Sequence, residues 1–255
     1  MKCFKWTLLA LTATMIFSCK KEDAPNNVIT NTTGEVGLEF NNYAGSNQLA
    51  LNTGNYVNAN GDTFNVTKFN YYISNVRLQK TDGSYYSFDG YHLIRDDAGS
   101  SKHFHLESVA TGTYKSVSFL LGVDSIRNTT GAQDGDLDPA LGMFWTWSTG
   151  YIMAKLEGTS SKSTASGKVF EYHIGGFNGA NSGLRLITLD FSSTPMEIKV
   201  GKESTIEIKT DVLKWFSPNI ISIGTTNSVT TVSSQSKMIA DNYANMFSVM
   251  SVTNE

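Results

Sequence analysis

Hydrophobic and polar residues alternate along most of the chain beyond residue 34. Val36, Leu38 and Phe40 are separated by small or polar residues, and the same period of two runs from Tyr114 to Val123. Such alternation predicts strands with one buried face. Further strands are predicted at residues 63–78 with a break near residue 70, 85–88, 91–95, 151–157, 169–174, 184–191, 196–200, 205–210 and 229–232. So many short strands predict an all-β fold, a single antiparallel, Greek-key-like β-sandwich.

One segment near the C-terminus departs from this alternation. Ile239, Tyr243, Met246, Phe247 and Met250 recur at helical spacing. This pattern predicts a short C-terminal helix or an extended arm that packs on the sheet. No internal repeat or interior linker divides the chain, so we expect residues 34–255 to form a single domain.

The first residues have the pattern of a bacterial export signal. A basic start is followed by an apolar stretch from Trp6 to Phe17, which is shorter than the roughly 20 residues of a membrane span. Residues 1–18 are therefore expected to be a signal peptide. Cys19 then resembles the lipidated cysteine of a lipoprotein, with residues 19–33 as a flexible tether.

Lys21 with the two acids that follow it also resembles the surface-export signal of Bacteroidetes lipoproteins. We expect a protein held by lipid on the outer membrane of such a Gram-negative bacterium, on its periplasmic face or at the cell surface.

Charge and cysteine content narrow the possible partners. The chain has 20 Lys and Arg against 23 Asp and Glu, a formal charge of −3, so nucleic acid is not expected to bind. The two cysteines, Cys3 and Cys19, both precede the domain, so a thiolate metal site is excluded there. Nucleophile elbows, zinc-protease motifs and P-loops are also absent from the sequence, so we do not expect an enzyme. We expect the protein to be a monomer.

Four histidines are the candidate metal ligands. His103 and His105 are two residues apart on a predicted strand, so both imidazoles would share one face, although solvated histidine pairs are common on strands. His92 and His173 lie on other predicted strands, where each is either a hydrogen-bonded core residue or a ligand. An imidazole-dominated site without thiolates suits copper, zinc or nickel rather than calcium or magnesium.

The segment 124–151 contains both aromatic and acidic candidate site residues. Trp145 and Trp147 would share one face of a strand, either as part of an aromatic wall or as core anchors. The acidic residues are compatible with a calcium site or with a plain acidic turn; they are Asp124, Asp134, Asp136 and Asp138. An EF-hand is excluded because Pro139 and Trp145 stand where its loop, counted from Asp134, requires Gly and Glu.

Several motifs together resemble the methanobactin-associated MbnP family over almost all of residues 34–250. They are residues 142–151 (GMFWTWSTGY), 155–158 (KLEG), 118–125 (SFLLGVDS), 71–78 (YYISNVRL), 91–94 (YHLI), 172–176 (YHIGG) and 240–243 (ADNY). The resemblance implies a β-sandwich that binds copper outside the cytoplasm. In some members of the family two histidines take part, and a di-haem cytochrome c peroxidase of the MbnH type oxidises a tryptophan to kynurenine.

Carried to this sequence, the resemblance points to His92 and His173 as ligands and to Trp145 or Trp147 as the oxidisable residue. His103 and His105 match no family motif and form an alternative metal pair. The expected function is copper capture, storage or handover, with copper as Cu(I) or Cu(II). The alternatives are a surface module that binds glycan or protein, with an exposed tryptophan and a calcium ion, and an accessory lipoprotein whose histidines have no ligand role.

Overall fold

The computed structural model describes residues 32–131, 133–146 and 148–255. The predicted signal peptide, the lipidation site Cys19 and Trp147 therefore lie outside the described residues. Residues Asn31–Glu255 form one compact unit. None of the helices within the described ranges is long and apolar enough to cross a membrane.

Over the described residues, five strands form the first sheet. In it β1 is central, β13 and then β15 lie on one side of β1, and β6 and β2 pair with successive parts of its other edge. β1 and β13 run parallel, whereas the remaining pairs are antiparallel. The strands are β1 (Thr33–Ala44), β2 (Asn47–Gln48), β6 (His103–Ala110), β13 (Glu203–Asp211) and β15 (Phe247–Asn254).

Ten strands of the described ranges form a second sheet around the long strand β4 (Thr63–Lys80). One edge of β4 pairs with β5 and β3, and the other pairs with β9 and β7 in turn. The other strands are β3 (Tyr56–Val57), β5 (Tyr85–Arg95), β7 (Gly112–Leu121), β8 (Phe144–Thr146), β9 (Gly150–Ser160), β10 (Val169–Gly175), β11 (Arg185–Asp190), β12 (Met196–Ile198) and β14 (Ser228–Val229). β10 and β14 run parallel.

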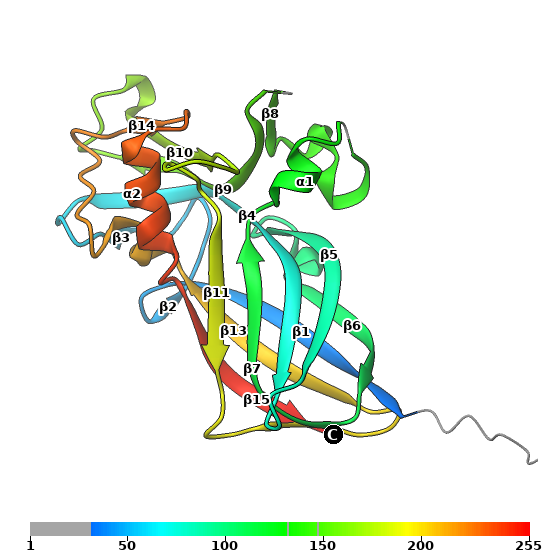
Figure 1. The fold of residues 1–255 in the computed structure, drawn as a ribbon. Coiled ribbons are helices and arrows are strands. Elements are labelled where there is room, and N and C mark those ends of the chain that lie inside the picture. Colours follow the sequence, from blue (N-terminus) through cyan, green and yellow to red (C-terminus); the bar gives the residue numbers. More distant parts are fainter. Residues whose placement is uncertain (1–31, 132, 147) are drawn as a thin grey trace, which may run out of the picture. The chain divides into compact units, whose positions relative to one another are not determined.

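Two short α-helices, α1 (Ser125–Asn128) and α2 (Ser234–Tyr243), complete the fold. Figure 1 shows that the two sheets cross as layers, with α2 beside β10, α1 near the middle of β4 and β8 beside the start of β9. The 3₁₀ turns are η1 (Gly99–Lys102), η2 (Gly135–Leu137), η3 (Pro139–Leu141), η4 (Ser166–Lys168) and η5 (Val212–Phe216).

Both faces of β4 are buried, and this divides the interior into two cores. Tyr71 and Ile73 face the main core between the sheets, whereas Tyr72 faces a smaller core with Leu93 and Tyr151. Residues two apart share a face of a strand, whereas adjacent residues point to opposite faces. Tyr71 faces the first sheet, so Tyr72 and the smaller core lie on the side of β4 away from the first sheet. We call that side the outer face of the second sheet.

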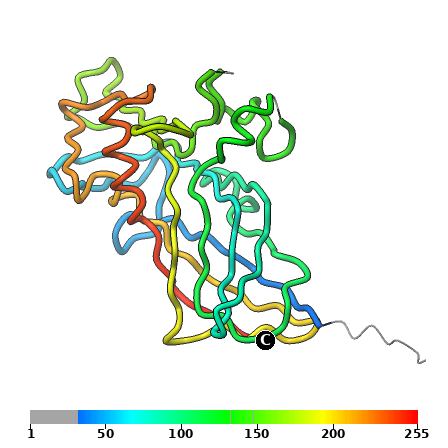
Figure 2. The backbone as a smooth tube through the Cα atoms, in the orientation of Figure 1, coloured from blue at the N-terminus to red at the C-terminus, as the bar shows by residue number. Residues whose placement is uncertain are grey.

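The predicted all-β sandwich with a helix near the C-terminus is confirmed. Two details differ from the expectation: the β1–β13 and β10–β14 pairs are parallel, and β15 follows the helix. In Figure 2 the blue trace of β1 and the red trace of β15 run in the same layer, because β13 lies between them.

Candidate metal centre

His173 lies on the outer face of the second sheet, hydrogen-bonded to a carboxylate. Its Nε2 is 2.8 Å from Oε1 of Glu157 on the neighbouring strand β9, and the His173 side chain is 16% exposed. The hydrogen bond to His173 is the main cause that holds the pKa of the Glu157 carboxyl below its ordinary value. Because a carboxylate can only accept, Nε2 is the donor in this contact, which leaves Nδ1 as the ring nitrogen that could bind a metal ion.

Trp145 packs over Gly175, which lies two residues after His173 on β10, because Gly175 has no side chain. A Cβ on Gly175 would lie 2.4 Å from Cζ3 of Trp145, so the indole occupies the place that any other residue would fill. Trp145 is half-buried and packs against the smaller core, which lies on the same outer face as His173. The sheet therefore places two of the predicted site residues on one face, near the same end of β10.

Lys155 fixes the segment that carries Trp145. Its side chain stands directly across from His173, and its Nζ donates a 2.6 Å hydrogen bond to the carbonyl oxygen of Gly142. Nζ is also 3.9 Å from Oε1 of Glu157, and burial lowers the pKa of Lys155. We call His173, Glu157, Lys155 and Trp145 the outer-face site.

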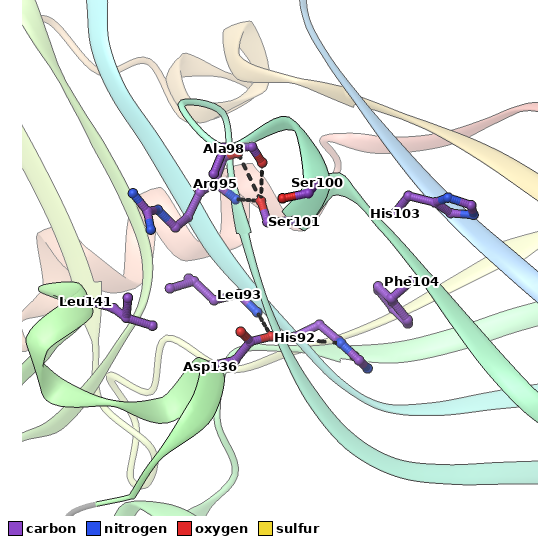
Figure 3. Close-up of a pocket in the computed structure, with 10 residues that line it drawn as sticks. All are labelled: His92, Leu93, Arg95, Ala98, Ser100, Ser101, His103, Phe104, Asp136 and Leu141. Carbon is purple, nitrogen blue, oxygen red and sulfur yellow. Dashed lines mark hydrogen bonds and ion pairs between the residues drawn. The ribbon is translucent and has the colours of Figure 1, made fainter.

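His92 lines a cavity of about 350 Å³ between β5, η1 and β6 (Figure 3). Its ring stacks on Phe104 with centroids 3.7 Å apart and planes 7° apart. Its Nδ1 is 3.9 Å from Oδ2 of Asp136, and its buried Nε2 has no hydrogen-bond partner among the residues that the structure describes. Burial outweighs the attraction of Asp136 and lowers the pKa of the imidazole.

The structure does not bring His92 and His173 to one ion. His92 stands directly opposite Ile73 of β4. His173 stands directly opposite Lys155 of β9, which in turn stands directly opposite Asn70 of β4. The two histidines are therefore three strands apart, about 14 Å at the usual strand spacing. Because Asn70 and Ile73 are three residues apart, the two imidazoles also point to opposite faces of the sheet.

His103 and His105 do share a face, as their spacing predicted. Of the side chains that the structure describes, they form with Glu203 one group of three potential ligands whose donor atoms all lie within 4.8 Å of one another. In Figure 3 the ring of His103 lies over β1, away from the ring of His92.

The four predicted calcium ligands serve in separate contacts. Asp124 accepts hydrogen bonds from Tyr91, Asn75 and the backbone of Arg127. Asp136 accepts from the backbone of Leu93, Asp138 accepts from that of Ala140, and Asp134 precedes η2. Asp124 and Asp138 thus cap α1 and η3, and Asp136 links η2 to β5, so the geometry does not gather the four carboxylates around one ion. The alternative surface module would expose Trp145 or Trp147; Trp145 is half-buried, and Trp147 lies outside the described residues.

The residues that complete each cluster were not predicted from the sequence. Glu157 and Lys155 are ordinary charged residues of one strand, and only the β9–β10 pairing places them beside His173. Glu203 is 98 residues from His105, so no local pattern connects them. The motifs at residues 155–158 and 172–176 contain Lys155, Glu157 and Gly175, but they indicated the family and not a shared site.

Comparisons with known proteins agree with this architecture. A family model described as MbnP matches residues 33–237. Among solved structures, MbnP from Methylosinus trichosporium superposes with a TM-score of 0.56 and 12% sequence identity, covering 80% of this chain and 83% of that one. At this identity the superposition shows the shared fold alone. No curated protein sequence matched.

Proposed function

Because the chain belongs to the MbnP family, we propose that it is an extracytoplasmic copper-binding protein that captures, stores or hands over copper. It would have no turnover chemistry of its own. The observation that carries the proposal is the outer-face site, where Glu157 holds the imidazole of His173 and the half-buried Trp145 packs over Gly175, two residues further along β10.

His173 would supply the first copper ligand through Nδ1. Glu157 would act as the outer partner that fixes the tautomer and orientation of the ring, as carboxylates do for metal-bound histidines. The indole and the smaller core beneath it would limit water around the ion, which influences its redox balance. A neutral imidazole suits both Cu(I) and Cu(II).

Trp145 would be the residue that a partner di-haem peroxidase of the MbnH type oxidises to kynurenine. Its partial exposure makes the ring accessible to an external oxidant, whereas Trp215 is completely buried. Kynurenine offers an aniline nitrogen and a ketone oxygen, which indole lacks, as further donors beside His173. Trp147 is the second candidate for this modification.

We place this activity outside the cytoplasm because of the signal peptide predicted at residues 1–18 and the lipidation predicted at Cys19. Lipid on Cys19 would hold the domain at the outer membrane through the tether that precedes β1. Radiolabelled palmitate incorporated by the parent, but not by Cys19→Ser, is the expected result. Equal incorporation by both proteins would contradict lipidation at Cys19.

Copper titration of the purified full-length protein tests the site. His173→Ala is expected to abolish tight copper binding on the outer face, and Glu157→Gln to weaken it by about 10–100-fold, the usual effect of losing an outer partner. His92→Phe is the matched control, since that histidine lies on the opposite face of the sheet. Parent-like affinities and stoichiometry in His173→Ala would disprove the assignment.

Peptide mass spectrometry of protein from its native host tests the modification. We expect the peptide containing Trp145 and Trp147 to have lost one carbon and gained one oxygen, with fragmentation identifying the residue. The buried Trp215 is the internal control and should be unchanged. Two intact indoles together with bound copper would leave a histidine site without kynurenine.

A further inference from the structure

We propose that His103, His105 and Glu203 form a second metal site, for a divalent transition-metal ion of the Cu(II) or Zn(II) class. It lies on the solvent side of the first sheet and uses none of the residues of the outer-face site. The inference therefore goes beyond the function proposed above and stands or falls separately from it.

Strand register brings the three ligands together. His105 on β6 is directly opposite Gly37 on β1, and Gly37 is directly opposite Thr205 on β13. His103 and Glu203 each lie two residues away from these positions, so all the side chains point to the same face. Phe104 and Leu106, which alternate with the histidines, point into the main core and fix the strand in this orientation.

Gly37 leaves the space in which the donor atoms meet. A Cβ on this residue would lie 2.6 Å from Oε1 of Glu203, 2.8 Å from Nε2 of His103 and 3.2 Å from Oγ1 of Thr205. Any larger residue at the centre of the three strands would hold these groups apart. The missing side chain of Gly37 thus creates a shallow cradle on the sheet.

The donor distances suit one ion. Nδ1 of His105 is 3.3 Å from Oε1 of Glu203, and the ring centroids of the two histidines are 4.5 Å apart. Ligands about 2.0–2.2 Å from a shared ion lie about 3–4 Å from each other. Side-chain rotation at this exposed face can bring His103, the remaining ligand, within that range.

The charges around Gly37 also favour a cation. Glu35 stands directly opposite Glu203, and Glu39 stands directly opposite Glu207. Like charges placed opposite each other on neighbouring strands destabilise a sheet. A divalent ion held between these two pairs would offset that repulsion.

The donor set determines the class of metal. Two imidazole nitrogens and one carboxylate oxygen suit Zn(II), Cu(II) or Ni(II), with Cu(II) bound most tightly, and do not suit Cu(I) as thiolates would. Three protein ligands leave one coordination position open, which is the arrangement of sites that accept a further ligand.

Isothermal titration of the metal-free full-length protein with Zn(II) and, separately, with Cu(II) tests the proposal. The His103→Ala/His105→Ala double variant should bind one equivalent less of each metal than the parent. Gly37→Ala retains every ligand but fills the cradle, and should weaken binding at this site by more than about 10-fold. Its added Cβ meets the ends of side chains and not backbone atoms, so the fold is expected to survive.

Glu203→Gln and Glu207→Gln form a matched pair, since both residues lie on the same face of β13 and only Glu203 belongs to the cluster. Glu203→Gln removes a ligand and should lower the affinity much more than Glu207→Gln, which removes only one of the nearby negative charges. If the histidine double variant binds as many equivalents as the parent with equal affinity, the second site does not exist. The second site would also be refuted if the parent binds only one equivalent of metal and His173→Ala binds none. That result would support the outer-face site.

Discussion

His92 shows how burial changes the behaviour of a single residue. Its ring stacks with Phe104 and Phe88, with centroid distances of 3.7 and 5.8 Å, and within the described part of the chain its Nε2 has no hydrogen-bond partner. Burial lowers the pKa of this imidazole below that of a free histidine, although Asp136 opposes the shift. The neutral ring is thus the form that the folded protein accommodates.

This lowered pKa predicts a stability that falls in mild acid. Below about pH 6.5 the unfolded chain protonates His92 readily, whereas the folded protein resists protonation until its own lower pKa is reached. Stability therefore decreases as the pH falls through this window. His92→Phe keeps the ring stacking and removes the titration, so its melting temperature should fall less between pH 7.5 and 5 than that of the parent. Equal pH dependence in the two proteins would contradict this account.

At the residue scale, the sequence predicts which side chains share a strand but not which strands meet. The spacing of His103 and His105 was sufficient to place both imidazoles on one face, and the structure confirms this placement. Glu203 could not be predicted as their partner, because a parallel pairing between β1 and β13 brings it there. The same limit explains why His92 and His173 could each be placed on a strand but not shown to lie apart.

At the element scale, the helix α2 depends on a reciprocal cap. The hydroxyl of Ser233 accepts a hydrogen bond from the backbone of Ser236, and the Ser236 side chain accepts one from the backbone of Ser233. The helix packs its buried residues Ile239 and Tyr243 into the main core. The start of α2 is thus linked to the stability of the whole domain.

Ser233→Ala should lower the free energy of unfolding by about 0.5–2 kcal/mol, the usual cost of losing an N-cap. The adjacent Ser234→Ala is the control, since Ser234 is exposed and lies within the helix, and its effect should stay within about 0.5 kcal/mol. Urea denaturation of both variants measures the difference. If the two serines proved equivalent, the cap would not be stabilising the fold.

Element boundaries differed from prediction where tertiary pairing outweighed the local pattern. The expected break near Asn70 does not occur, because Asn70 is buried in the middle of β4 and pairs on both sides. The helical spacing continued to Met250, yet α2 ends at Tyr243, since Phe247 begins the strand that pairs with β13. Free strand edges and buried partners decide such cases, and neither is visible in a local window.

At the scale of the whole molecule, the main core separates the two proposed metal sites. The outer-face site lies on the side of the second sheet away from the first sheet, and the His103–His105–Glu203 cluster lies on the solvent side of the first sheet. Between them Phe40 contacts Tyr71, Phe104, Phe119 and Phe247, with ring centroids 5.8–6.2 Å apart. The two sites share no ligand and no ligand-bearing strand.

Sites separated by a close-packed core and without shared contacts are expected to behave additively. His173→Ala should therefore change the affinity of the His103–His105–Glu203 cluster for Zn(II) by less than about twofold, and Gly37→Ala should leave copper binding at His173 equally unaffected. Titration of each variant and of the double variant measures both effects. Because coupling between binding sites is reciprocal, a change of about fivefold or more should appear in both directions if it appears in one. Such a change would mean that the two sheets shift together when metal binds, and that the core transmits this shift.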